Sequence, residues 1–248
     1  MKKRNKLIKI GHRGAKGFVL ENTISSIEHA IKLGTESIEI DVYRCRSGEI
    51  IVFHDETLER LAKSNERIEE LSLVEIQKVK LGGDLYIPTL KEVIEIVKGR
   101  VEINIELKGS NTAEGTFELV SKALETNFWK HGDFLISSFI KEELVKYREL
   151  DSDILIGVLS ENSPIESIPF AKKVNAYAIH PNINFLNKKE VEIMQQEGFK
   201  VFAYTIKTSL EKQRMKKMGV DGVFCDYPGR YTILKKALRR VQAPFLSP

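Results

Sequence analysis

Apolar runs of strand length alternate with segments of helical periodicity along most of the chain, and this alternation constrains the fold more than any other feature. Eight apolar runs predict strands, over residues 7–11, 37–43, 101–109, 134–139, 153–160, 176–182, 200–206 and 221–228. Eight helical patterns follow them, over residues 22–34, 89–99, 113–127, 141–150, 165–173, 187–198, 209–219 and 231–240. Strands that alternate with helices in this way form right-handed βαβ units, so we expect a parallel sheet.

Eight such units in a chain of 248 residues predict an α/β protein with a closed (β/α)₈ barrel, the TIM barrel. A doubly wound open sheet is the alternative. We expect residues 1–248 to form one domain. The run 48–55 is an additional strand that we expect to pair with its neighbour. The stretch 56–88 interrupts the rhythm, and we interpret it as a small inserted subdomain of loops and a short helix at the barrel rim.

Acidic side chains recur at alternate positions of two predicted strands. Glu39 and Asp41 lie two residues apart, so both project from the same face of their strand. Asn104, Glu106 and Lys108 share one face of the next barrel strand for the same reason. The apolar residues between them would face the helices. We therefore expect the polar sets to point into the barrel near its mouth, where the active sites of such barrels lie.

Three carboxylates directed inward repel one another and lose hydration, which is costly unless the charge is balanced. A hard divalent cation, Ca²⁺ or Mg²⁺, prefers oxygen ligands and would balance it. An internal salt-bridge network with Lys108 and Arg13 is the alternative. We favour a metal site because two acids on one strand and a third on the next suit coordination. The oxygen-only ligand set disfavours tetrahedral zinc.

Two histidines end strands near this carboxylate cluster. His12 ends the first predicted strand and His54 ends the run 48–55. Histidine titrates near neutral pH, so the pair can supply one base and one acid, although either could instead be a structural hydrogen-bonding residue. Arg13 offers a fork of N–H groups for a phosphate or a carboxylate.

The other three histidines fit this site less well. His180 also ends a predicted strand, and for it a pocket position and a packing position are both open. His29 and His131 lie in a helix and near a helix exit, so we expect both on the surface.

The composition excludes several classes of protein. The net charge of +4 arises from Lys and Arg residues near the two ends, and the rest of the chain is mildly acidic. We therefore expect no nucleic-acid partner. No apolar run approaches the roughly 20 residues of a membrane span, so we expect no integral membrane segment and a cytoplasmic protein. The two cysteines are far apart, which suits a reducing compartment.

Several short motifs together resemble one known family, the glycerophosphodiester phosphodiesterases. The motifs are "GHRG" and "ENT" within 11–23, "IEIDV" at 38–42, "VFHD" at 52–55, "IPTLKEV" at 87–93, "IELK" at 105–108 and "GVDGVFCDYP" at 219–228. The resemblance implies a (β/α)₈ barrel with a small insertion. It implies that Glu39, Asp41 and Glu106 bind the divalent metal, that His12 and His54 are the acid–base pair, and that Arg13 and Lys108 contact the phosphate.

The family hydrolyses glycerophosphodiesters to glycerol 3-phosphate and an alcohol. Our hypothesis is attack by the glycerol 2-hydroxyl, with one histidine as base and the other as acid, followed by opening of the cyclic phosphate by water. Direct attack by a water at the metal is the alternative. Two rival functions remain at this point, a phospholipase D that acts on lysophospholipids through an apolar channel and a barrel that binds phosphorylated ligands without turnover. The sequence predicts a small-molecule substrate and no particular oligomeric state.

Overall fold

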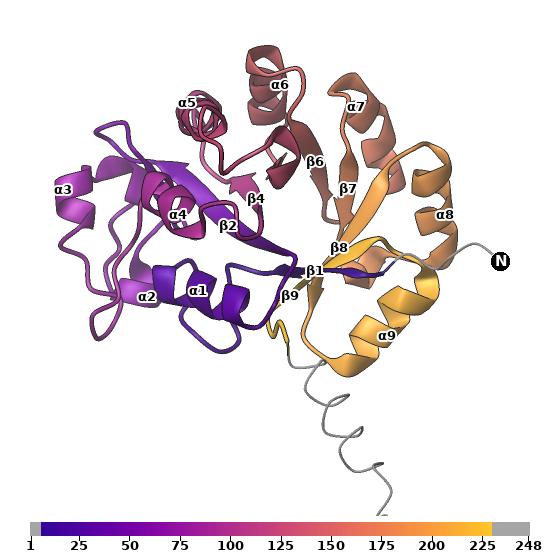
Figure 1. The fold of residues 1–248 in the computed structure, drawn as a ribbon, viewed down its shortest axis with the longest axis horizontal. Helices are drawn as coiled ribbons and strands as arrows, with labels where there is room; N and C mark the ends of the chain where they lie inside the picture. The colour runs from indigo at the N-terminus through magenta and orange to yellow at the C-terminus, as the bar shows by residue number, and fades with distance from the viewer. Residues whose placement is uncertain (1–5, 230–248) are drawn as a thin grey trace, which may run out of the picture.

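The computed structural model describes residues 6–229, which form a closed ring of eight parallel strands surrounded by helices (Figure 1). The ring strands are β1 (Ile8–Gly11), β2 (Ser37–Arg44), β4 (Glu102–Leu107), β5 (Phe134–Ser138), β6 (Leu155–Ser160), β7 (Ala178–Pro181), β8 (Lys200–Ile206) and β9 (Gly222–Cys225). Strand β1 pairs with both β2 and β9, which closes the ring. The predicted (β/α)₈ barrel is therefore confirmed, and the open sheet is excluded.

The additional strand β3 (Ile50–Val52) pairs antiparallel with β2 and lies outside the ring, as the sequence predicts. Residues 56–88 follow it and contain three short helical elements, α2 (Glu59–Ala62), η1 (Ile68–Glu70) and α3 (Leu73–Ile76). They lie at one end of the molecule, on the left in Figure 1. Their apolar side chains pack with Ile51 of β3 in a cluster that is separate from the barrel core. This cluster includes Phe53, Leu58, Ile68 and Ile76.

Helices on the outside of the ring connect the strands. They are α1 (Ile24–Lys32), α4 (Leu90–Val97), α5 (Ala113–Leu124), α6 (Lys141–Leu150), α7 (Ile168–Lys173), α8 (Lys188–Gln196) and α9 (Ser209–Met218), with the short elements η2 (His131–Asp133), η3 (Ile165–Ser167) and η4 (Ile183–Phe185). Side-chain caps start several of them. The Thr208 hydroxyl, for example, accepts from the Glu211 amide in a capping box. The helix expected over 231–240 lies outside the described residues.

The alternation of side chains along the strands separates two apolar layers. Ile38, Ile40 and Val42 of β2 pack in the large cluster between the strands and the helices. A smaller cluster inside the ring contains Ile10, Leu135, Ala178, Phe202 and Phe224. The polar residues of β2 and β4 lie on the inner face, where the parallel register pairs Glu39 with Asn104 and Asp41 with Glu106. The predicted inward direction of these side chains follows from this register.

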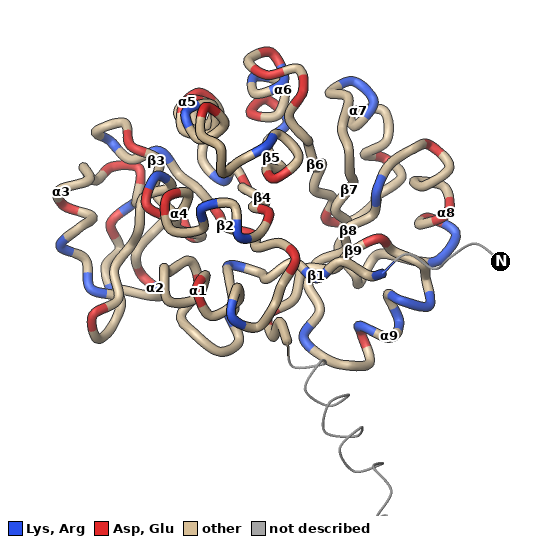
Figure 2. The backbone as a smooth tube through the Cα atoms, viewed as in Figure 1, with Lys and Arg blue, Asp and Glu red and all other residues tan. Residues whose placement is uncertain are grey.

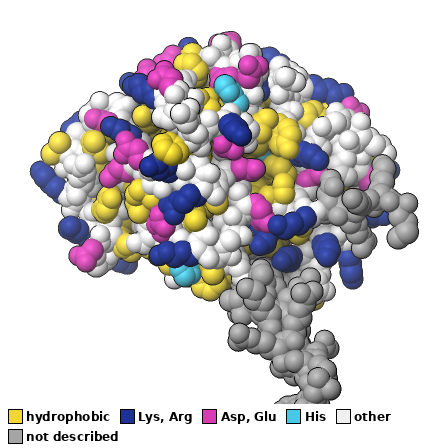
Figure 3. All heavy atoms as spheres, in the orientation of Figure 1, with side chains coloured by type: hydrophobic (Ala, Val, Ile, Leu, Met, Phe, Trp, Pro, Cys, Tyr) yellow, Lys and Arg dark blue, Asp and Glu magenta, His cyan; other side chains and the backbone are white. Residues whose placement is uncertain are grey.

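Charged residues of both signs are distributed along the outer helices (Figure 2). On the face drawn in Figure 3 they are interspersed with hydrophobic side chains. Within residues 6–229, no helix has both the length and the apolar character that crossing a membrane requires.

Candidate active site

The carboxyl ends of the strands surround a cavity of about 330 Å³. Six of the predicted site residues line it, namely His12, Arg13, Glu39, His54, Glu106 and Lys108. The seventh, Asp41, contacts Arg13 beside it. Other walls of the cavity come from Asn104, Ser137, Phe139, Leu159, Glu161, Tyr204, Thr205 and Phe224. The structure thus brings all seven predicted residues together at the end of the barrel where active sites of this fold lie.

Glu39, Asp41 and Glu106 form a compact carboxylate cluster. One oxygen of each lies within 4.8 Å of the others. Glu39 is 2% exposed and Asp41 is 1% exposed. Among the residues that the structure describes, Oε1 of Glu39 has no hydrogen-bond donor. A buried carboxylate oxygen without a donor needs a positive partner, and oxygen atoms from three carboxylates suit a hard cation. The residues present therefore fit a divalent cation.

Burial and mutual repulsion change the proton affinity of this cluster. Burial, and then the charges of Asp41 and Glu106, raise the pKa of Glu39 well above its usual range. Burial, and then Asp41, raise the pKa of Glu106 to about 7, even though Lys108 acts in the opposite direction. The Lys108 ammonium lies 3.2 Å from Glu106 Oε1. Protons and a cation are therefore competing ways to neutralise the same three groups.

Arg13 is fixed to this cluster through its backbone and its side chain. Its backbone lies in the left-handed region, with φ of 50°, which is uncommon for a residue with a side chain. Its N–H donates to Glu39 Oε2 at 2.8 Å. Its Nη1 donates to Glu21 Oε1 at 2.5 Å, and its Nε lies 3.2 Å from Asp41 Oδ2. The guanidinium is thus held at the cavity wall by two acids on different segments.

Glu21 and Asn22 explain why "ENT" follows "GHRG" so closely. Glu21 accepts hydrogen bonds from Arg13 and from Arg60 of α2. Burial raises the pKa of Glu21, but the Arg60 hydrogen bonds and the Arg13 charge outweigh burial and hold it below the usual value. Asn22 Nδ2 donates to Asp41 Oδ2 at 2.9 Å. The loop after β1 therefore anchors both the arginine and one of the clustered carboxylates.

His12 is oriented by an aspartate from the other end of the described chain. Its Nδ1 lies 2.6 Å from Oδ1 of Asp226, which directly follows β9. Burial lowers the pKa of His12, although Asp226 opposes this shift. With Nδ1 bonded to a carboxylate, Nε2 is the nitrogen left to exchange a proton.

His54 has the same kind of partner, supplied by its neighbour in sequence. Its Nδ1 lies 2.6 Å from Asp55 Oδ1, and Arg60 Nε donates to Asp55 Oδ2 at 2.6 Å. Burial lowers the pKa of His54, and the nearby charge of Asp41 opposes it. Each of the two cavity histidines is therefore part of a carboxylate–imidazole pair, with Nε2 free of that partner.

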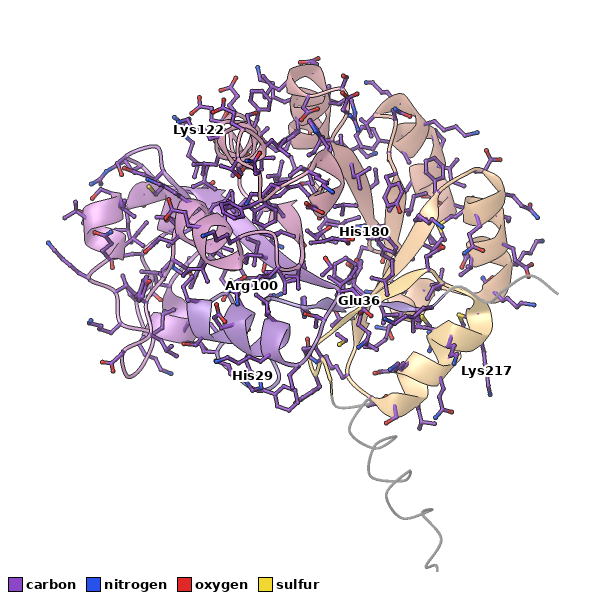
Figure 4. All side chains as sticks on the ribbon, viewed as in Figure 1. His29, Glu36, Arg100, Lys122, His180 and Lys217 are labelled. Atoms are coloured by element: carbon purple, nitrogen blue, oxygen red, sulfur yellow. The ribbon has the colours of Figure 1, made fainter. Side chains whose placement is uncertain are left out.

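The other histidines lie away from the cavity wall. His180 is fully buried inside the ring of strands, where its imidazole packs against Phe202 and Phe224 (Figure 4). Of the two positions left open for His180, the structure shows the packing position and not the pocket position. His131 is exposed, as expected. His29, on the outer side of α1 in Figure 4, is half-buried against Phe18.

Sequence reasoning missed the partners that orient the predicted residues. Asp55 was detectable, because it follows His54 directly. The roles of Glu21 and Asn22 were harder to predict, because the same residues are typical of the start of a helix. Asp226 lies in the motif "CDYP", but nothing local connects it with His12, which is 214 positions away. Tyr204 and Glu161 reach the cavity only because the ring closes.

A closed (β/α)₈ barrel that gathers acids, histidines and cations in a cavity at the carboxyl ends of its strands has the architecture of a barrel enzyme. Residues 12–230 match the model of the glycerophosphoryl diester phosphodiesterase family. A glycerophosphodiester phosphodiesterase of Caldanaerobacter subterraneus subsp. tengcongensis is 34% identical over 233 residues, which cover 90% of this chain and 95% of that protein. The chain therefore belongs to the glycerophosphoryl diester phosphodiesterase family.

Two further relatives extend the comparison. A solved Oleispira antarctica phosphodiesterase, in complex with the product sn-glycerol 3-phosphate, superposes with a TM-score of 0.84 at 28% identity, covering 92% of this chain and 96% of that one. A human lysophospholipase D is 32% identical over 169 residues, which cover 63% of this chain and 49% of that protein.

Proposed function

We propose that the protein hydrolyses glycerophosphodiesters to glycerol 3-phosphate and an alcohol, with a divalent cation and a histidine pair. The observation that carries this proposal is the placement of three clustered carboxylates and two carboxylate-paired histidines around one cavity. Family membership and the product-bound relative support it. A barrel that only binds phosphorylated ligands has no need for two oriented histidines.

The cation site in this proposal consists of Glu39, Asp41 and Glu106. The unpartnered Oε1 of Glu39 supports this assignment, and so do the raised pKa values of Glu39 and Glu106. Ca²⁺ and Mg²⁺ both suit oxygen ligands. A bound cation would supply positive charge to the phosphate and would remove the repulsion among the three carboxylates.

Arg13 and Lys108 bind and orient the phosphate group. Both side chains line the cavity, and both also contact the carboxylate cluster, which holds them in place. A phosphodiester carries one negative charge and gains more as the nucleophile attacks. Fixed cations beside it therefore bind the transition state more tightly than the ground state.

His12 and His54 move the protons. In the first step, one imidazole Nε2 takes the proton of the glycerol 2-hydroxyl as its oxygen bonds to phosphorus. The other histidine, protonated, gives its Nε2 proton to the alcohol oxygen as the P–O bond breaks. The roles then reverse, and water opens the cyclic phosphate to glycerol 3-phosphate. Asp226 and Asp55 hold the two rings so that Nε2 is the exchanging nitrogen.

Residues 56–88 form the rim insertion of this single domain in our proposal. Their link to the site is Arg60, which donates to Asp55 and to Glu21. The insertion thereby fixes the second histidine through Asp55 and the arginine through Glu21.

Release of glycerol 3-phosphate from glycerophosphocholine tests the proposal. We expect turnover that is lost with EDTA and restored by Ca²⁺ or Mg²⁺. Turnover of a lysophospholipid but not of a glycerophosphodiester would identify the protein as a lysophospholipase D instead. Absence of turnover with both substrates, under every cation, would contradict the assignment.

A further inference from the structure

The wall of the cavity that faces the predicted phosphate site carries a negative charge without a cationic partner. The carboxylate of Glu161 accepts from the Tyr204 hydroxyl at 2.7 Å and from Asn182 Nδ2 at 2.8 Å. Within residues 6–229 it forms no ion pair, in contrast to Glu106, which pairs with Lys108. Two neutral donors therefore hold a full negative charge in a fixed position at the cavity rim.

Two aromatic rings lie beside this carboxylate. Phe139 and Tyr204 both line the cavity, with ring centroids 6.1 Å apart and planes at 87°. Phe139 is 43% exposed, which is high for a large apolar side chain directly above a barrel core. Aromatic rings next to a carboxylate are the combination that binds ammonium and quaternary ammonium groups, because both the ring quadrupole and the charge attract a cation.

The order of strands places Glu161 and Tyr204 across the ring from strands of the predicted phosphate site. Around the ring the strands follow one another as β1, β9, β8, β7, β6, β5, β4 and β2. Glu161 directly follows β6, which lies opposite β1, the strand that leads into His12 and Arg13. Tyr204 lies on β8, which is opposite β4, the strand of Glu106. Glu161 and Tyr204 therefore stand across the ring from strands of the predicted phosphate site. Phe139 follows β5, which lies between β6 and β4 in the ring, so it comes between Glu161 and Lys108.

We propose that Glu161, Tyr204 and Phe139 form a subsite for a positively charged alcohol group, so that the enzyme prefers glycerophosphodiesters whose alcohol carries an ammonium or trimethylammonium group. This inference rests on the proposed function, and it names the substrate class of the same site. Such a substrate is a zwitterion, and the cavity offers Arg13 and Lys108 to its phosphodiester anion and the Glu161 carboxylate with two aromatic rings to its cation. Lys108, whose ammonium lies 5.9 Å from the Phe139 ring centroid, is paired with Glu106.

The test compares steady-state kinetics on two diesters, glycerophosphocholine with a cationic alcohol and glycerophosphoglycerol with a neutral one. The wild-type enzyme should show the higher kcat/KM on glycerophosphocholine. Glu161→Gln should raise KM for glycerophosphocholine about fivefold, with kcat unchanged, since one partly exposed charge is removed. Phe139→Leu should raise KM for glycerophosphocholine about fivefold, because the aromatic ring is lost. Neither variant should change KM for glycerophosphoglycerol.

A matched control is Glu166→Gln. Glu166 lines the neighbouring groove with Glu161 but does not line the cavity, so its loss should change neither KM. Tetramethylammonium chloride should inhibit the wild-type enzyme competitively, while sodium chloride at equal concentration should not. The inhibition should weaken in Glu161→Gln.

Three results would overturn the subsite. They are equal kcat/KM of the wild-type enzyme on the two diesters, equal changes in KM on the two diesters in the variants, and unchanged KM on both. In each case turnover of either diester still supports the proposed function. Absence of turnover with both diesters would instead reject the proposed function, and the subsite with it.

Discussion

The backbone N–H of Arg13 donates to one carboxylate oxygen of Glu39, while the other oxygen of the same group is buried without a donor in the described structure. The first contact fixes the carboxylate in position, and the second oxygen is left directed at the cluster with Asp41 and Glu106. This asymmetry supports the proposed role of Glu39 as a cation ligand over a structural ion pair, in which both oxygens would be satisfied.

Glu39→Gln should weaken Ca²⁺ or Mg²⁺ binding by at least about tenfold and should lower activity in parallel. The neutral amide still accepts from Arg13 but gives the cation one charge less. Titration calorimetry and the cation dependence of turnover measure the two effects. Without metal, the variant should melt no lower than the wild-type protein, because a repelling buried charge is gone. Unchanged activity would show that the metal assignment is wrong.

Metal binding should release protons, and more of them at about pH 6 than at about pH 8. The pKa of Glu106 is raised from 4.5 to about 7, so this carboxyl is largely protonated at the lower pH and must ionise to bind a cation. Titration calorimetry in two buffers with different ionisation enthalpies counts the protons. Proton release that does not change with pH would contradict the link.

The raised pKa of Glu106 also predicts how the free energy of unfolding of the metal-free protein changes with pH. The folded pKa lies above the unfolded one, so this group stabilises the fold fully below pH 4.5, and the contribution is lost as the pH rises through about 7. A saturating cation should reverse the trend, because it binds the ionised form.

Asp226→Asn should lower kcat by roughly 10²- to 10⁴-fold with a much smaller change in KM, as for other carboxylate–imidazole pairs. The amide can donate to His12 Nδ1, which favours the tautomer that carries its proton on Nε2 and so removes the base. Steady-state kinetics on glycerophosphocholine measure the effect. Asp84→Asn, which changes an exposed acid of the 56–88 segment, is the matched control and should leave kcat unchanged. Equal losses in both variants would argue against an orienting role.

His180 should make the protein sensitive to acid independently of catalysis. Burial lowers the pKa of His180 from 6.5 to about 3. Between these values the unfolded chain binds the extra proton, so stability falls as the pH falls from about 6.5, by at most about 1.4 kcal/mol per pH unit. His180→Leu lacks this contribution, so the difference in unfolding free energy between variant and wild type, measured by urea unfolding, should itself change with pH by this slope. His131→Gln, at an exposed site, should retain the contribution of His180.

The side-chain directions at the site could be predicted from two facts: side chains of a strand alternate between its two faces, and the chain contains eight strands of a closed barrel. Glu39 and Asp41 alternate with apolar residues, and so do Asn104 and Glu106, so their common face follows from geometry alone. The end of the barrel followed from the position of each residue within its strand. These arguments need no knowledge of contacts between distant segments.

The contacts across the ring could not be predicted in this way. Asp226 reaches His12 because β9 pairs with β1, and the pairing of Ile10 with Phe224 sets the register. Tyr204 meets Glu161 because β8 and β6 both border the cavity. Sequence spacing contains no information about which residue stands opposite another once the ring closes. The partner of His54 was local and could have been recognised, since a carboxylate next to a strand-end histidine is a frequent orienting device.

The contact between β1 and β9 also sets a time at which the site can form during protein synthesis. His12 leaves the ribosome early, but its aspartate partner lies 214 residues later. At roughly 5–20 residues per second, the histidine waits roughly 10–40 s for its carboxylate. Nascent chains that end before β9 lack the closing strand, and those that end before Asp226 lack the carboxylate that orients the imidazole. Catalysis should therefore begin only when nearly the whole barrel has been translated.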